Sequence, residues 1–192
     1  MKIGVLASQG AFIEHIEKLR QLGVEAMPVR LPRELEGLGG LVIPGGESTS
    51  IGRLMRDYKL TRAILDRVKA GMPVFGTCAG LILMAKKSDD ARFEPLGLMD
   101  ITVRRNAFGR QRESFETELN VPVLGEKPFP GVFIRAPLIE QANGTVSVLA
   151  KLADGTIVAV REGKMLALAF HPELTDDLRF HQHFLEIVSG KS

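Results

Sequence analysis

The chain has 192 residues, of which 45% are hydrophobic, and its 25 basic and 23 acidic side chains leave a formal net charge of +2. This near balance argues against a nucleic-acid-binding face or a polybasic membrane surface, and a single cysteine excludes an internal disulfide. The apolar run at residues 165–170 is far shorter than the ~18 residues of a membrane-spanning helix, and the apolar N-terminus is too short for a signal-peptide core. We therefore expect a cytoplasmic globular protein with one domain over residues 1–192, and no nucleic-acid or membrane partner.

In the first half of the chain, short apolar runs alternate with helical patterns. The runs predict strands, which lie at residues 3–7, 24–29, 41–43 and 73–75. Apolar residues at helical spacing, with glycine stops, predict the helices between and after them, at residues 12–22, 48–58, 60–70 and 81–85. This alternation favours an α/β fold: a three-layer, doubly wound (flavodoxin-like), mostly parallel sheet.

The second half of the chain changes character. Short apolar runs predict further strands, at residues 101–103, 115–121, 132–134, 146–149, 156–160 and 165–170. Turn residues at 153–155 and 162–164 are typical of hairpins. We therefore expect an antiparallel extension of the same sheet, followed by a closing helix over residues 175–188.

The segment GTCAG at residues 76–80 separates a predicted strand from a predicted helix. This G-x-C-x-G arrangement is typical of a nucleophile elbow, a sharp turn that holds its central residue in a strained conformation and exposes its side chain. Cys78 would lie at a helix N-terminus, where backbone N–H groups favour a thiolate, and the N–H of Ala79 would face a developing oxyanion. The alternative is a buried cysteine that serves only as a small hydrophobic residue.

His171 and Glu173 directly follow the apolar run at residues 165–170. Residues two apart in an extended chain point to the same side, so Glu173 could orient the His171 imidazole as the base that a cysteine nucleophile needs. A strand-end histidine beside an unrelated acid is the alternative. Cys78 and His171 would share a crevice if both lie at the carboxyl ends of strands in one parallel sheet.

The segment PGGES at residues 44–48 also follows a predicted strand. Its glycines would let backbone N–H groups approach a ligand closely. A plain turn with Ser48 as the helix cap is the alternative. The segment is not a phosphate loop of the G-x-x-x-x-G-K type, because no lysine follows in the required place.

The remaining histidines and basic clusters carry weaker signals. We expect His15, in the first helix, at the surface or an interface. His181 and His183 are two residues apart on a predicted helix and therefore face different directions, so no metal site is predicted. The basic residues at 104–105 and 110–112 form a patch that is either a solvated face or a contact for an anionic substrate group.

The elbow, the later HPE and the early PGG, in this order, resemble the class I glutamine amidotransferases, which use a Cys–His–Glu triad. Longer segments resemble one branch, the glutaminase subunit of pyridoxal 5′-phosphate synthase (the PdxT family). These are PGGEST at residues 44–49, FGTCAGL at 75–81, RNAFGRQ at 105–111, GVFIRAP at 131–137 and FHPELT at 170–175. The segment GVLASQGA at residues 4–11 also fits, although Ser8 stands where leucine is usual. The resemblance covers essentially the whole chain.

The resemblance implies that Cys78 attacks the side-chain amide of glutamine. His171 would act first as general base and then as acid to the departing ammonia, and Glu173 would orient and stabilise the imidazolium. The N–H groups of Gly46 and Ala79 would form the oxyanion hole. The positions that correspond to glutamine-binding residues of the family are Gly46, Glu47, Ser48, Arg105, Ile134 and Arg135. Guanidinium groups suit this role because they can hold the α-carboxylate of glutamine bidentately.

The resemblance also implies a partner. The ammonia would pass to a synthase subunit, the (β/α)₈ barrel of the PdxS family, in a heteromeric complex that builds pyridoxal 5′-phosphate. No cofactor is expected in this chain, and nothing in it is expected to bind pyridoxal phosphate. Since the family's glutaminase subunit is largely inactive alone, we expect docking to complete the oxyanion hole, with the loop at residues 8–10 taking part.

Three other functions compete with this interpretation. A glutaminase subunit of another amidotransferase, such as that of imidazole glycerol phosphate synthesis, is disfavoured by the short chain and the RNAFGRQ segment. A cysteine-dependent protein of the PfpI type is disfavoured by the antiparallel extension and the HPE segment. The third is a non-enzymatic flavodoxin-like module with an inert core cysteine, which predicts that Cys78 resists a glutamine-like alkylating agent.

Overall fold

The structure is a computed structural model that describes residues 1–105 and 114–191. Five strands of its main sheet lie side by side in parallel. In spatial order they are β2 (Glu25–Val29), β1 (Lys2–Leu6), β3 (Gly40–Ile43), β4 (Val74–Thr77) and β12 (Met165–Leu168). This is the strand order of a flavodoxin-like doubly wound sheet, so the predicted fold class is confirmed.

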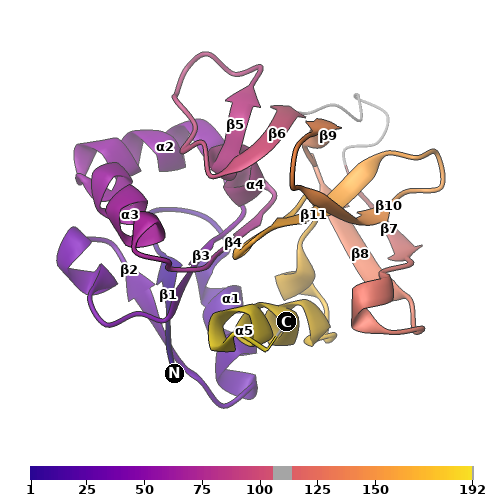
Figure 1. The fold of residues 1–192 in the computed structure, drawn as a ribbon, viewed down its shortest axis with the longest axis horizontal. Coiled ribbons are helices and arrows are strands. Elements are labelled where there is room, and N and C mark those ends of the chain that lie inside the picture. Colours follow the sequence, from indigo (N-terminus) through magenta and orange to yellow (C-terminus); the bar gives the residue numbers. More distant parts are fainter. Residues whose placement is uncertain (106–113, 192) are drawn as a thin grey trace.

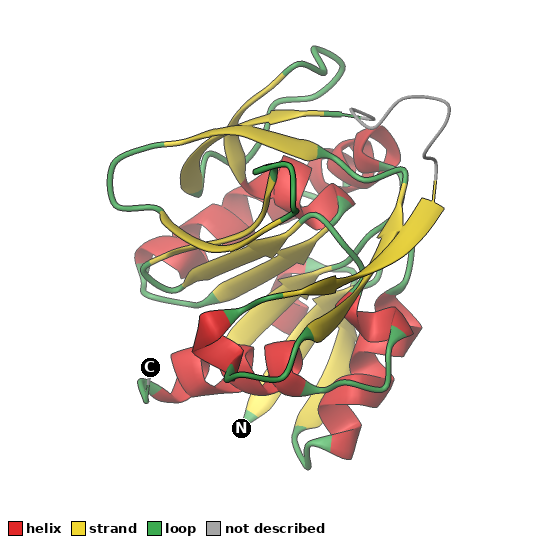
Figure 2. Cartoon of the chain, turned by 90° about the vertical axis from the view of Figure 1, so that its right-hand side faces the viewer, coloured by secondary structure: helices red, strands yellow, loops and turns green. Residues whose placement is uncertain are grey.

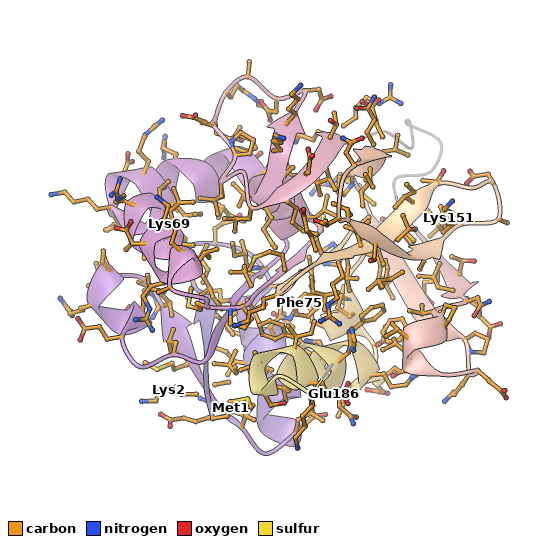
Figure 3. The ribbon with its side chains drawn as sticks, in the orientation of Figure 1. Met1, Lys2, Lys69, Phe75, Lys151 and Glu186 are labelled. Carbon is orange, nitrogen blue, oxygen red and sulfur yellow. The ribbon has the colours of Figure 1, made fainter. Side chains whose placement is uncertain are left out.

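Helices cover both faces of this parallel part (Figure 1). On one side lie α1 (Phe12–Gln21) and α5 (Arg179–Ser189), and on the other α2 (Ser48–Asp57), α3 (Leu60–Lys69) and the short α4 (Ala79–Met84). Figure 2 shows the same layers from the side, with helices flanking the strands. Strands between two helix layers must be apolar on both faces, and every residue of β3 and β4 is buried. In Figure 3 the labelled Phe75 lies in this interior, whereas Lys69 and Lys151 project outward.

The predicted antiparallel extension is present. Beyond β12 the sheet continues through β11 (Ile157–Glu162), β9 (Leu138–Ala142) and β6 (Met99–Arg104), each antiparallel to the strand before it, and β10 (Ser147–Lys151) pairs with β11. The predicted turns at residues 153–155 and 162–164 join the hairpins β10–β11 and β11–β12. An edge strand, β5 (Ala85–Ser88), runs parallel to β6.

One part of the predicted extension is wrong. We expected the strands near residues 115–121 and 132–134 to continue the main sheet, but β7 (Ser114–Leu119) and β8 (Phe129–Ile134) form a separate two-stranded sheet. Apolar contact holds this ribbon against the core: the rings of Phe129 and Phe133 lie 5.9 and 5.3 Å from that of Phe170. Strand propensity predicts extended chain but not which sheet a strand joins.

The last helix begins later than predicted, at Arg179 rather than at residue 175. The hydroxyl of Thr175 donates to the carbonyl of Pro172 and accepts the N–H of Asp177. The Asp177 carboxylate accepts the N–H of Arg179. Such local side-chain bonds offer the backbone an alternative to helix. Residues 175–178 therefore turn before α5 starts.

Candidate active site

The predicted site residues gather at one edge of the parallel sheet. Loops that follow β1, β3, β4 and β12 carry residues 7–11, 44–47, 78 and 169–171 respectively. Because the carboxyl ends of parallel strands meet at the same edge, these loops share one crevice. The position of the site therefore follows from the topology.

Cys78 has the strained conformation that the elbow pattern predicts. Its φ is +50° and its ψ is −102°, and α4 begins with the next residue. A positive φ is costly for a residue with a side chain and persists only where its surroundings impose it. A Cβ on Gly80 would lie 2.0 Å from the carbonyl oxygen of Ile43, and one on Gly76 would lie 2.5 Å from Met84 Sδ. The two glycines are therefore required by close packing.

His171 and Glu173 form a buried pair. His171 Nδ1 lies 2.7 Å from Glu173 Oε1, which leaves Nε2 for the hydrogen bond with Cys78. The backbone does not make this contact in the way we expected, because Pro172–Leu174 form a turn of 3₁₀ helix (η3) instead of extended chain. The ring is also held from the other side: a Cβ on Gly45 would lie 2.5 Å from His171 Cε1.

The protonation of this pair follows from its contacts. Burial lowers the pKa of His171, but hydrogen bonds with Cys78 and Glu173 outweigh it and raise the pKa to about 10. Burial raises the pKa of Glu173, whereas the facing His15 and the hydrogen bond with His171 lower it below its usual range. An imidazolium beside a carboxylate is therefore the stable form at neutral pH, and it leaves a proton available next to Cys78.

A cavity of about 210 Å³ opens above the sulfur. This is small beside the roughly 300–1,000 Å³ of sites for drug-sized ligands, and it suits a single amino acid. Its lining contains every predicted site residue except Glu173, which lies behind His171: Gln9, Gly46, Glu47, Ser48, Cys78, Ala79, Ile82, Arg105, Ile134, Arg135 and His171.

Ion pairs order the side of the cavity opposite the elbow. Arg105 contacts Glu47 Oε1 at 2.5 Å through Nη2 and Asp90 Oδ2 at 2.7 Å through Nη1. Asp90 also holds Arg92 at 2.6 Å. Hydrogen bonds from Arg92 and then Arg105 outweigh partial burial and keep the pKa of Asp90 well below its usual range. Arg105 is thus fixed by two carboxylates, and Asp90 is a residue that the sequence analysis missed.

The helix cap at α2 differs from the prediction. Glu47, not Ser48, caps the helix, because its carboxylate accepts the N–H groups of Thr49 and Ser50. Partial burial raises the pKa of Glu47, but hydrogen bonds from the side chains of Thr49 and Ser50, together with these backbone bonds, outweigh it and lower the pKa to about 2. Ser48 is the first residue of the helix and is buried at the cavity wall. The cap thus places a fixed negative charge at the cavity rim.

Arg135 carries a second strained backbone. Its φ is +43°, and it follows directly on Ile134, the last residue of β8. Among the residues that the structure describes, positive φ outside glycine occurs only here, at Cys78 and at Lys59. Two of these three residues line the same cavity, as expected where strain is held at a functional site.

The loop at residues 8–10 contacts the glycine loop after β3. The Gln9 side-chain oxygen accepts the N–H of Glu47 at 2.8 Å, and the carbonyl of Gly45 accepts the N–H of Ala11 at 3.2 Å. A Cβ on Gly10, whose φ is +96°, would lie 1.8 Å from the oxygen of Gly45. Movement of the first loop would therefore change the orientation of the Gly45–Gly46 backbone.

Other sequence predictions fare differently. His15 is fully buried, so the expected surface position is wrong; it lies on the apolar face of α1, three residues after Phe12 and four before Leu19, a spacing that could have revealed it. His181 and His183 do face different partners, His15 and Glu186. Within residues 1–105 and 114–191, no cluster of potential ligands could hold a metal ion and no helix could span a membrane. The basic cluster at residues 110–112 lies outside the described residues.

Comparisons with known proteins agree with this geometry. Residues 5–190 match the SNO glutamine amidotransferase family. The chain is 59% identical to pyridoxal 5′-phosphate synthase subunit PdxT of Herpetosiphon aurantiacus, over 96% of this chain and 99% of that protein. It is 57% identical to the protein of the same name from Dehalococcoides mccartyi (98% and 97%). A crystal structure of a glutamine amidotransferase superposes with a TM-score of 0.92 and 51% identity, covering 97% of this chain and 98% of that one.

Proposed function

The chain belongs to the SNO glutamine amidotransferase family, and from that membership and the site geometry we propose that it is the glutaminase subunit of a pyridoxal 5′-phosphate synthase. It hydrolyses L-glutamine to L-glutamate and ammonia. The observation that carries the proposal is the strained Cys78 at the floor of a small cavity, hydrogen-bonded to a histidine that a buried carboxylate holds. We place the activity in a single amidotransferase domain over residues 1–192, in the reducing cytoplasm, where a lone cysteine stays a free thiol.

Hydrolysis proceeds in two halves through a thioester. Cys78 Sγ forms a bond to the amide carbon of glutamine, and the carbonyl oxygen takes up the negative charge. As the C–N bond breaks, His171 gives its proton to the departing nitrogen, which leaves as ammonia. His171 then removes a proton from water, which attacks the thioester and releases glutamate and the thiolate. Glu173 keeps the ring in one orientation and stabilises its charged form.

Backbone N–H groups stabilise the oxyanion. Ala79 presents its N–H at the first residue of α4, beside the sulfur, and Gly46 presents its N–H from the loop after β3. Donors aimed at the developing charge in a water-poor site supply a large part of the rate enhancement. Gly45, on the same loop as Gly46, packs against Gly10 of the loop after β1, so the geometry of the two loops is coupled.

Glutamine binds by its charged end on the ion-paired side of the cavity. Arg105 and Arg135 attract its α-carboxylate, while Glu47 balances Arg105 and attracts the α-ammonium group. Ser48 and the backbone of Ile134 line the remaining wall. A zwitterionic substrate is matched by a rim that carries both signs of charge.

The ammonia passes to a partner. We propose a heteromeric complex with the synthase subunit of the PdxS family, a (β/α)₈ barrel that consumes ammonia without exposing it to solvent, where it would be protonated. Docking against the segment at residues 8–10 would fix the Gly45–Gly46 loop, because Gln9 and Ala11 hold that loop directly. Hydrolysis would then be fast only when an acceptor is present.

Glutamate release measured with and without the synthase subunit tests the proposal. We expect a low rate for the chain alone and a large increase in the complex. We also expect a glutamine-like alkylating agent to label Cys78 stoichiometrically, and glutamine to protect it. If Cys78 resists the alkylating agent in the complex, the chain is a non-enzymatic binding module. If the rate of glutamate release is unchanged by the synthase subunit, docking does not activate the enzyme.

A further inference from the structure

An imidazole lies beside each oxygen of the buried Glu173 carboxylate. Oε1 lies 2.7 Å from His171 Nδ1, and Oε2 lies 3.3 Å from His15 Nε2. Glu173 is 2% exposed and His15 is 0% exposed. The carboxylate is therefore sandwiched between two imidazoles in a region closed to water, and only one of them belongs to the triad.

His15 is itself fixed by neighbours on two further elements. Its Nε2 lies 3.1 Å from the hydroxyl of Thr77, the residue before the nucleophile, and its Nδ1 lies 2.9 Å from His181 Nε2 on α5. Its ring also meets Phe75 edge-on, with centroids 6.1 Å apart. The ring of His15, on α1, is thus held by contacts with both β4 and α5.

The contacts determine which nitrogen of His15 carries a proton. Burial lowers the pKa of His15 and holds that of His181 well below its usual value, so both rings are neutral. A neutral imidazole has one donor and one acceptor. The ionised Glu173 can only accept, so His15 Nε2 carries the hydrogen; His15 Nδ1 then accepts from His181 Nε2. His181 thus donates to His15. The Nε2–H of His15 bonds the Thr77 hydroxyl while it faces Oε2 of Glu173, a buried oxygen that has no hydrogen-bond partner among the residues that the structure describes.

We infer that His15 is a positioning residue for the glutaminase reaction: it holds Oε2 of Glu173 so that Oε1 stays directed at His171 throughout the cycle. This rests on the proposed function. During turnover His171 alternates between imidazolium and imidazole. Each time His171 becomes neutral, the Glu173 carboxylate loses the charge attraction that holds it against the ring. A neutral donor on its far side, which does not titrate with His171, supplies a constant hold. His181 donates to Nδ1 of His15 and thereby keeps the proton of His15 on Nε2.

The first test is His15→Leu, which removes the donor and keeps an apolar side chain, in the complex with the synthase. Loss of the hydrogen-bond partner behind a metal-bound histidine typically costs about 10–100-fold; by analogy, we expect kcat to fall by about 10–100-fold here while KM changes by less than about threefold. The acidic limb of the kcat profile should also move to higher pH, because loss of a donor to a carboxylate raises its pKa. The charged groups that act on Glu173 and His15 are His171, Glu14 and, through His181, Lys18.

A pair of polar variants separates positioning from packing. His15→Gln places an amide N–H near the site of Nε2, whereas the shorter His15→Asn places one near Nδ1 and does not reach the carboxylate. We expect the glutamine variant to recover most of kcat and the original pH limb, and the asparagine variant to resemble leucine. Equal kcat values and pH limbs in the folded glutamine and asparagine variants would overturn the inference, even if the leucine variant does not fold.

His183→Leu is the matched control. His183 is a 3% exposed imidazole on the same helix as His181, and it faces Glu186 instead of the site. It should keep wild-type kcat and pH dependence, with thermal unfolding monitored for every variant. An active wild-type complex with an equally active His15→Leu variant would refute the positioning role alone. A wild-type complex that releases no glutamate would instead refute the proposed function.

Discussion

The two sides of the cavity are built from different interactions. On the elbow side, Cys78, His171 and Glu173 are each less than 10% exposed and are held by a strained turn, close glycine packing and buried hydrogen bonds. On the opposite side, Arg105 and Glu47 form an ion pair whose side chains are 22% and 40% exposed. Exposed pairs are screened by salt and contribute little individually. The elbow side should therefore control kcat, and the charged side KM.

The largest effect is expected at the nucleophile. Cys78→Ala removes the proposed nucleophile, so turnover should fall to background; loss of a nucleophile costs roughly 10⁶-fold in a serine hydrolase with a comparable triad. Glutamine binding should remain detectable by calorimetry, because the charged side is untouched. Persistent glutamate release from the purified variant complex would remove Cys78 from its role.

Glu173→Gln should give the next largest effect. An amide in place of the carboxylate favours the wrong histidine tautomer, so we expect kcat to fall by about 10²–10⁴-fold with the fold intact. Glu173→Ala should fall at least as far. A wild-type rate in either variant would make Glu173 an uninvolved acid.

The pH dependence sharpens the same prediction. The pKa of Glu173 is lowered in the folded protein, so its support of His171 is complete above its ordinary pKa, near 4.5, and is lost only as the pH falls through the lowered value. Wild-type kcat should therefore persist into mildly acidic solution, provided that the complex stays folded. Glu173→Gln has no carboxylate to titrate at this position. Its low kcat should lack that limb, as a pH series in the complex would show.

Arg105→Gln tests the charged side. A hydrogen bond to a charged group contributes roughly 1.5–3 kcal/mol, so we expect KM for glutamine to rise by about 10–100-fold, with kcat changed far less. The rise should shrink at high ionic strength, because screening weakens the wild-type contact. If initial-rate assays show a lower kcat at unchanged KM, Arg105 acts in the chemical step and not in glutamine binding.

The elbow side was largely predictable from sequence, because its geometry is encoded locally. Cys78 has glycines on both sides, an apolar strand before it and a helix after it. This local pattern is compatible with few backbone conformations other than the elbow. The apolar runs likewise predicted the parallel strands, of which β3, β4 and β12 are buried along their whole length. The pairing of His171 with Glu173 was also predicted, although η3 rather than extended chain creates it.

The rest depends on contacts between distant segments. Asp90 lies 15 residues from Arg105 and 43 from Glu47, and no spacing rule links them. His15 and His181, 166 residues apart, meet only because α1 and α5 share one face of the sheet. The polar strands β5 and β9 escaped notice because few of their residues are buried, so their sequences lack the alternation that predicts a half-buried strand.

Asp90→Asn should give the smallest effect. It tests whether Asp90 contributes to the position of Arg105 in addition to Glu47. Asp90 contacts Nη1 of Arg105 whereas Glu47 contacts Nη2, and the Asp90 side chain is 5% exposed. Loss of its charge leaves Glu47 as the only carboxylate on Arg105, while the asparagine oxygen can still accept a neutral hydrogen bond. Because a neutral bond replaces a charged one, we expect KM to rise by only about two- to fivefold, and kcat to stay unchanged. The control is Asp66→Asn, which breaks the exposed Arg62–Asp66 pair on α3 and should leave both constants unchanged. A KM equal to wild type would mean that Glu47 alone orders Arg105, and a lower kcat would mean that the two sides of the cavity are coupled.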